Sequence, residues 1–150
     1  MVYLQEPTTV KSNELTAEII IEVPFYDLDP MNIVWHGNYV KYCEKARCEL
    51  LKKIDYDYDQ MRESGYLWPI IDIRLQYVGS ASFGQKIKCV ATLVEYENRL
   101  KIKYQISCLE SGKRLTKGYS VQVAVGIESQ EMLLVSPDII FEKLGVERSV

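Results

Sequence analysis

The polar residues between positions 26 and 39 are the part of this sequence that could carry out chemistry. Asp27 and Asp29 lie two residues apart, and His36, the one histidine of the chain, follows seven residues after Asp29. A carboxylate such as that of Asp29 can act as a nucleophile or as a general base, for example in attack on an ester or thioester carbonyl. The same residues also allow a structural role, because aspartates often cap loops and helices. Spacing alone leaves both alternatives open.

A helix is predicted to position these residues. Five apolar side chains recur at spacings of four, three, four and four residues, which places them on one stripe of a helix that packs against a core. They are Tyr39, Cys43, Ala46, Leu50 and Ile54. Gly37 and Asn38 suit the start of this helix, where a short side chain can bind free N–H groups. The helix N-terminus offers N–H donors and a partial positive charge, which would keep Asp29 ionised and polarise a carbonyl oxygen.

The remaining segments alternate apolar and polar residues with a period of two, which is typical of β-strands. One strand is expected near residues 16–25, and four more are expected from residue 67 onward, the last over residues 115–125. A short helix is expected over residues 138–144. This order indicates an α+β fold, in which an antiparallel five-stranded sheet is wrapped around one long central helix.

The composition indicates one soluble globular domain over residues 1–150, with residues 1–15 as a loosely held N-terminal arm. Hydrophobic residues make up 47% of the chain and charged residues 26%. No apolar run approaches the roughly 20 residues of a membrane span, and the N-terminus lacks a signal pattern. The four cysteines show neither a CxxC pair nor a metal-ligand spacing. We therefore expect no metal site, no membrane span and a cytoplasmic location.

Charge is unevenly distributed along the chain. The net charge is −3, yet residues 86–117 contain eight basic and three acidic side chains. The favoured interpretation of this basic run is the solvated face of a sheet, and the alternative is a contact for a phosphorylated small ligand. Nucleic acid is not an expected partner, because the chain is acidic overall and carries no recognisable nucleic-acid-binding motif.

The segment of residues 26–39, followed by residues 44–47 (Glu-Lys-Ala-Arg), resembles the 4-hydroxybenzoyl-CoA thioesterase-like branch of the hotdog-fold acyl-CoA thioesterases. The turns at residues 84–87 and 111–113 are also similar to that family, and the resemblance extends over residues 17–145. It implies a hotdog fold, two subunits that join their sheets edge to edge in a homodimer or homotetramer, and an active site at the dimer interface. It also implies an acyl-CoA or acyl-carrier-protein substrate and no separate cofactor, because coenzyme A is part of the substrate.

The resemblance further assigns roles to individual residues. It implies that Asp29, the aspartate followed by Pro30, is the catalytic carboxylate, and that the backbone N–H at position 36 polarises the carbonyl. His36 could also orient substrate or water, and it stands where the hydroxybenzoyl enzyme has tyrosine, which argues against a hydroxybenzoyl substrate. The residues expected to contact substrate are Trp35, Gly37, Asn38 and Tyr39.

Several alternatives accompany this hypothesis. Asp29 could form an acyl anhydride or deprotonate water, and the sequence does not separate these two mechanisms. A second hotdog lineage carries its catalytic carboxylate on the helix, but here Glu44 lies three residues before Arg47 and is expected to pair with it. A hotdog enoyl-CoA hydratase or dehydratase is the rival enzyme. A non-catalytic protein that binds acyl-CoA or acyl carrier protein is the rival of another class.

Overall fold

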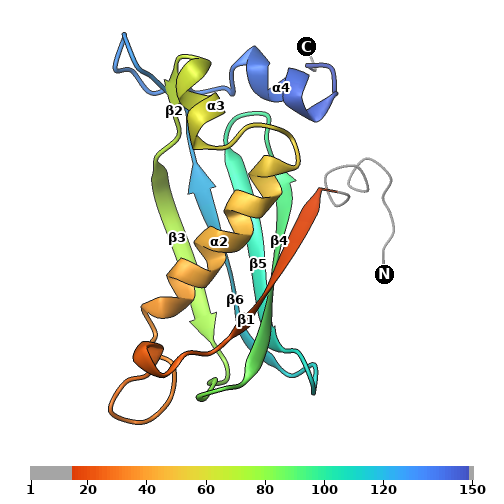
Figure 1. Cartoon of the computed structure of the whole chain (residues 1–150). Helices are drawn as coiled ribbons and strands as arrows, with labels where there is room; N and C mark the ends of the chain where they lie inside the picture. The colour runs from red at the N-terminus through yellow and green to blue at the C-terminus, as the bar shows by residue number, and fades with distance from the viewer. Residues whose placement is uncertain (1–14, 149–150) are drawn as a thin grey trace.

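The computed structural model describes residues 15–148, so the predicted N-terminal arm lies outside the described residues except for Leu15. A five-stranded antiparallel sheet with the strand order β1-β4-β5-β6-β3 curves around helix α2 (Figure 1). Its strands are β1 (Thr16–Glu22), β3 (Ile70–Tyr77), β4 (Lys86–Glu95), β5 (Leu100–Cys108) and β6 (Arg114–Gln122). The prediction of an α+β protein with this sheet and one long helix is confirmed.

The helices and a small second sheet complete the described chain. The helices are α2 (Asn38–Lys52), α3 (Tyr58–Glu63), α4 (Asp138–Leu144) and a short 3₁₀ helix, η1 (Phe25–Asp27). Strands β2 (Tyr66–Leu67) and β7 (Val125–Gly126) pair with each other in a separate two-stranded sheet. Among residues 15–148, no helix has both the length and the apolar composition that crossing a membrane requires.

Three predicted strand boundaries differ from the structure. The first strand ends at Glu22, because the chain turns into η1 after Pro24. The strand expected from residue 67 onward is divided, and Pro69, which has no N–H group to donate to a ladder, lies between β2 and β3. The last long strand is also divided, since β6 ends at Gln122 and β7 begins at Val125.

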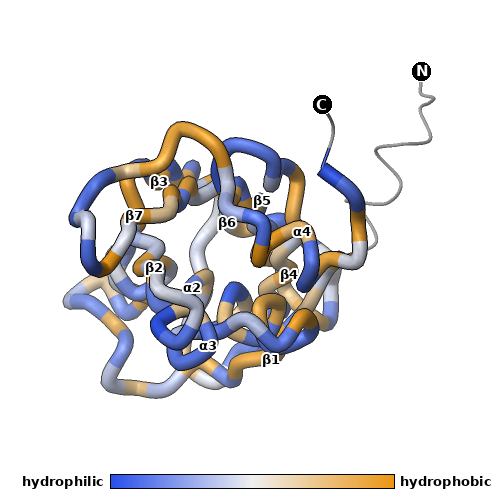
Figure 2. Tube along the Cα trace, turned by 90° about the horizontal axis from the view of Figure 1, so that it is seen from above, coloured by the Kyte–Doolittle hydropathy of each residue, from blue (hydrophilic) through white to orange (hydrophobic). Residues whose placement is uncertain are grey.

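The hydrophobic core lies between α2 and one half of the sheet. Helix α2 packs on β1 and β4, and the inward-facing residues of β4 and β5 are almost completely buried against it. These are Ile87, Cys89, Ala91, Leu93, Leu100, Ile102, Tyr104 and Ile106. Figure 2, seen from above, shows the strands forming an arc around α2. At the other end of that arc, β3 is an edge strand whose residues are exposed apart from Leu75.

Candidate active site

A tight loop after η1 carries Asp29 close to the start of α2. The Asp29 N–H donates to the Ile33 carbonyl at 2.8 Å, and the Asn32 N–H donates to the Asp29 carbonyl at 2.9 Å. Asn32 has a φ of 65°, a left-handed conformation that asparagine tolerates better than most residues. The Asp29 carboxylate accepts the Met31 N–H at 2.8 Å, which closes an Asx turn. The loop is therefore held by its own backbone.

The Asp29 carboxylate remains available for chemistry. It is half-buried, and among residues 15–148 the Met31 N–H is the one hydrogen-bond donor that contacts it. Its charge acts on the first turn of α2: burial raises the pKa of Tyr39, and the nearby Asp29 carboxylate adds to that shift. Asp29 thus lies near the helix N-terminus, as predicted, with one carboxylate oxygen free of protein hydrogen bonds within the described chain.

Asp27, two residues earlier, has a structural role. Its side chain is 7% exposed and accepts a hydrogen bond from the Tyr42 hydroxyl at 2.6 Å, and Lys41 Nζ lies 3.8 Å from the Asp27 carboxylate. Burial and then the bond to this carboxylate raise the pKa of Tyr42. The Asp27 carbonyl also accepts the side-chain amide of Asn38 at 2.8 Å. Asp27 therefore fixes the loop to the first turns of α2.

Two backbone N–H groups are free at the start of α2. The Trp35 N–H donates to the Asp27 carbonyl, and the N–H groups from Asn38 onward donate into the helix. Among the hydrogen bonds of the described residues, the His36 and Gly37 N–H groups donate none. A pair of adjacent unpaired donors at a helix N-terminus is suited to an oxyanion or a polarised carbonyl oxygen.

Gly37 leaves room for the side chain of Trp35 beside it. A Cβ atom on residue 37 would lie 2.3 Å from the Trp35 ring, so any larger residue would displace the indole. The Trp35 ring is 50% exposed and its centroid lies 5.1 Å from that of His36. Glycine thus lets an aromatic side chain lie directly beside the two free N–H groups.

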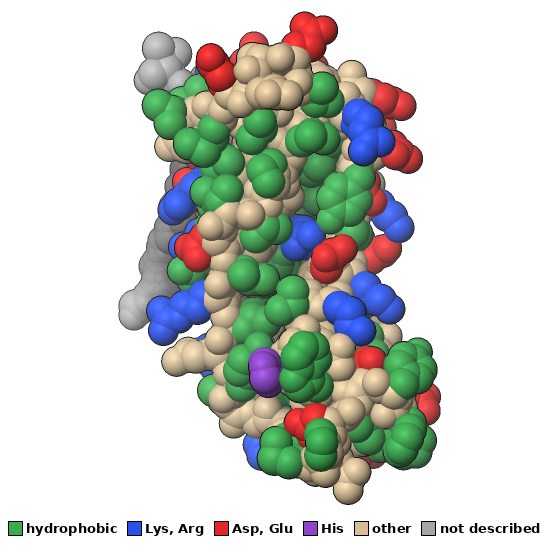
Figure 3. All heavy atoms as spheres, turned by 90° about the vertical axis from the view of Figure 1, so that its left-hand side faces the viewer, with side chains coloured by type: hydrophobic (Ala, Val, Ile, Leu, Met, Phe, Trp, Pro, Cys, Tyr) green, Lys and Arg blue, Asp and Glu red, His purple; other side chains and the backbone are tan. Residues whose placement is uncertain are grey.

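Strand β3 contributes a residue that the sequence did not indicate as part of the site. The Tyr77 hydroxyl donates to the His36 carbonyl at 3.1 Å, and its ring centroid lies 6.1 Å from the His36 ring and 5.5 Å from the Tyr39 ring. Figure 3 shows the histidine on the surface with hydrophobic side chains beside it. The only sequence signal was an aromatic residue at the end of a strand, which is too common to identify a site.

The predicted site residues thus fall into two groups. His36 and Trp35 are exposed, and the His36 imidazole has no hydrogen-bond partner within residues 15–148. Tyr39 and Asn38 are buried: the Tyr39 hydroxyl accepts the Ala81 N–H at 3.3 Å, and the Asn38 amide is bound to Asp27. Within one copy of the chain, Trp35 and His36 are therefore accessible to a ligand, while the side chains of Tyr39 and Asn38 hold the site together.

Glu44 and Arg47 pair on α2 as expected, with an Nη2–Oε1 distance of 3.9 Å. Arg47 is buried, and its Nη2 also donates to the Tyr58 hydroxyl at 3.0 Å, while the Glu44 side chain is largely exposed. The charge of the guanidinium is thus offset mainly by hydrogen bonds, and Glu44 lies well along the helix from the free N–H groups.

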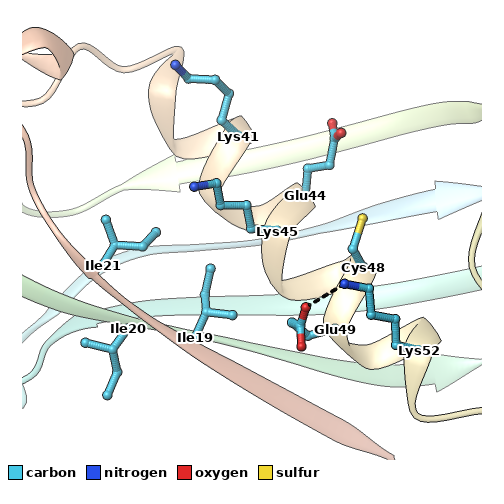
Figure 4. Close-up of a pocket in the computed structure, with 9 residues that line it drawn as sticks. All are labelled: Ile19, Ile20, Ile21, Lys41, Glu44, Lys45, Cys48, Glu49 and Lys52. Atoms are coloured by element: carbon cyan, nitrogen blue, oxygen red, sulfur yellow. Dashed lines mark hydrogen bonds and ion pairs between the residues drawn. The ribbon is translucent and has the colours of Figure 1, made fainter.

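A groove between β1 and α2 has a volume of about 550 Å³ and is lined by Glu44, Cys48 and Glu49 of α2, together with three lysines and three isoleucines. Isoleucines of β1 form one wall, and charged residues of α2 form the other (Figure 4). Both acidic residues of the groove are paired, Glu49 with Lys52 at 3.1 Å and Glu44 with Arg47 at 3.9 Å. Neither Asp29 nor His36 lines this groove, so its size does not identify it as the reactive site.

Comparisons with known proteins indicate the family of the chain. The model of the thioesterase-like superfamily matches residues 23–140. The chain is 32% identical over 110 residues to the candidate acyl-CoA thioesterase YneP of Bacillus subtilis, covering 73% of this chain and 79% of that protein. It is 30% identical over 90 residues to the acyl-CoA thioesterase YbgC of Helicobacter pylori, covering 59% and 65%. The structure of DHNA-CoA thioesterase from Staphylococcus aureus matches with a TM-score of 0.72 and 25% identity, covering 79% of this chain and 80% of that one.

Proposed function

Because the chain belongs to the thioesterase-like superfamily of hotdog-fold proteins, we propose that it hydrolyses acyl-CoA thioesters to the free acid and the thiol. The observation that carries this proposal is the pair of His36 and Gly37 N–H groups that donate no hydrogen bond within residues 15–148, together with the half-buried Asp29 carboxylate near the same end of α2. Hydrolysis of an ester or thioester needs both parts. The donors bind the carbonyl oxygen, and the carboxylate either attacks the carbonyl carbon or activates the water that attacks it.

In the proposed mechanism the thioester oxygen accepts hydrogen bonds from the His36 and Gly37 N–H groups. Negative charge builds on this oxygen as the carbonyl carbon becomes tetrahedral, so the donors stabilise the transition state more than the substrate. Removal of one donor of this kind typically costs about 3–4 kcal/mol. Because these donors lie at the N-terminus of α2, the partial positive charge of the helix dipole also stabilises the negative charge on the oxygen.

Asp29 supplies the second half of the reaction. As a general base it takes a proton from water, the hydroxide adds to the carbonyl carbon, and the C–S bond then breaks. The proton returns to the departing thiolate. As a nucleophile, Asp29 would attack the carbonyl carbon and expel the thiolate, which leaves an acyl anhydride. Water would then cleave the anhydride to the free acid and the Asp29 carboxylate, and a proton of that water would neutralise the thiolate. The exposed His36 side chain, next to the free N–H groups, is suited to orient water or the substrate in either route.

A second copy of the chain would complete the site. Strand β3 is a free sheet edge with exposed isoleucines, and such edges pair readily with another strand. Tyr77 of this strand already contacts His36, so pairing of two β3 strands would place a second subunit beside the free N–H groups. We propose a homodimer on this edge, a cytoplasmic location suited to the four free cysteines, and coenzyme A or acyl carrier protein as the thiol.

The experiment is Asp29→Asn, which keeps the shape of the side chain but removes its charge. Thiol release from short aliphatic to aromatic acyl-CoA substrates should fall by about 10²–10⁴-fold, the range that general acid–base catalysis contributes. Asp59→Asn, at an exposed position on α3, is the matched control and should keep wild-type turnover. Wild-type rates in Asp29→Asn would remove the assignment, and enoyl-CoA hydration without thiol release would favour the hydratase instead.

A further inference from the structure

The outer face of the sheet, opposite α2, carries four basic side chains around one tyrosine. In the strand register, Arg74 of β3, Tyr119 of β6 and Lys103 of β5 form one row across the sheet. Lys117 lies two residues before Tyr119, and Lys101 Nζ lies 4.5 Å from the centroid of the Tyr119 ring. The basic residues that the sequence spreads over more than 40 positions therefore form one cluster.

This cluster surrounds a surface cavity of about 400 Å³. Its lining contains the four cations and no acidic residue: Arg74, Gln76, Val94, Lys101, Lys103, Lys117, Gly118 and Tyr119. Gln76, which pairs with Lys117 across β3 and β6, adds an uncharged hydrogen-bonding group. The charges are thus arranged around a hollow in the surface, where an anion can contact several of them at once.

The cations of the cavity have no acidic partner in the described chain. None of the ion pairs of residues 15–148 includes Arg74, Lys101, Lys103 or Lys117. Glu95, which pairs with Lys101 in the sheet register, is bound to Arg99 at 3.0 Å. Apart from the contact of Lys101 with the Tyr119 ring, repulsion between these cations is relieved by solvent and salt, and a multivalent anion would relieve it further.

We propose that this cavity binds a polyphosphate group. Ammonium and guanidinium groups form charge-assisted hydrogen bonds with phosphate oxygens, and a chain of two or three phosphates can bridge several of the four cations. A second copy of the chain is a poor occupant, because two-fold packing of this face would bring the cations of both copies together. The site lies on the sheet face opposite α2, so it is separate from Asp29 and His36 and does not depend on the proposed hydrolysis.

The test is titration calorimetry of the full chain with inorganic tripolyphosphate and, separately, with coenzyme A. We expect saturable binding of tripolyphosphate that weakens with salt. Lys103→Gln combined with Lys117→Gln should weaken it at least tenfold. Lys86→Gln combined with Lys88→Gln is the matched control: it removes the same charge from the strand on the other side of β5, outside the cavity, and should leave binding nearly unchanged.

Two outcomes would overturn the proposal: absence of saturable tripolyphosphate binding, or equal weakening by both double variants, which would mean attraction by the general surface charge. A tenfold loss for both ligands in the cavity variant would support the site and identify coenzyme A as a phosphate source. If the cavity variant loses affinity for tripolyphosphate alone, the site is still supported, and a free polyphosphate is its phosphate source. Thermal unfolding of each variant, expected to match wild type, confirms that the substitutions act locally.

Discussion

Helix α2 covers the inner face of β4 and β5, here called the covered half of the sheet, and leaves the inner face of the edge strand β3, here called the open half, largely exposed. Ile102 of β5 is completely buried beneath the helix, while Ile73 of β3, on the same inner face, is 39% exposed. The two strands have similar alternating sequences, so the difference comes from the position of the helix. Apolar residues in the covered half stabilise the monomer, and those in the open half are available to a second subunit and to substrate.

The largest expected effect tests the covered half. Leu50 of α2 is completely buried, so Leu50→Ala should lower the free energy of unfolding by about 2–5 kcal/mol, because the lost contacts and the remaining cavity both cost stability. Ile73→Ala in the open half should cost no more than about 1 kcal/mol in dilute protein. Urea unfolding of both variants gives the comparison. Equal losses would contradict the distinction between the two halves.

The next prediction tests what covers the open half. Ile73→Lys places a charge on the inner face of β3, where the proposed dimer would bury it, so self-association should weaken at least tenfold and thioesterase activity should fall with it. Light scattering across a concentration series measures the change. Ile20→Lys on the opposite edge strand, at a position that is 55% exposed, is the matched control and should leave association unchanged. A dimer that survives Ile73→Lys would exclude the β3 edge as its interface.

The sequence was sufficient to predict the covered half because each of its elements repeats one pattern. The spacing of Tyr39, Cys43, Ala46 and Leu50 predicted α2, and all four are buried in the core. The fifth residue of the predicted stripe, Ile54, lies in a turn beyond Lys52, where α2 ends. The alternation in β4 and β5 gave the correct buried set for the same reason: one face of each strand meets a continuous apolar surface.

On β6, the strand between the two halves, this signal was insufficient. On β6, Thr116, Ser120 and Gln122 are buried although they are polar. Ser120 is satisfied by the Tyr104 hydroxyl at 2.6 Å, a partner from another strand that periodicity cannot reveal. Polarity alone therefore could not assign the inner face of this strand.

The candidate site was predictable only in part for a similar reason. The sequence indicated a carboxylate and free N–H groups at the start of α2. It could not show that Asp27 would be buried under Tyr42 while Asp29 kept a free oxygen, because the two aspartates differ only in their tertiary partners. The contribution of Tyr77 could not be predicted for the same reason. Strand order in the folded sheet places the end of β3 next to the N-terminus of α2, and the sequence does not give that order.

The prediction with the smallest expected effect compares the reactivity of a cysteine beneath α2 with that of a cysteine at the end of β5. Cys89 lies beneath α2 and is completely buried, and its hydrogen bond with Cys43, followed by its burial, raises the pKa of its thiol. Cys108, at the end of β5, is partly exposed. Hydrogen bonds from the side chain and backbone of Ser111, and then from Gln85, lower its pKa to about 7. Because the thiolate is the reactive form, Cys108 should react with iodoacetamide faster than an ordinary thiol at pH 7.

The sign of the pH dependence follows from that lowered pKa. Below pH 7 the Cys108 thiol is protonated and alkylation should slow, whereas above pH 7 the rate should reach a plateau earlier than for a thiol of ordinary pKa, about 8.5. Mass spectrometry of peptides alkylated across a pH series measures the midpoint. Ser111→Ala removes the first donor and should move the midpoint to higher pH. If Cys89 in the native protein were alkylated as fast as Cys108, α2 would not be shielding the strands beneath it from solvent.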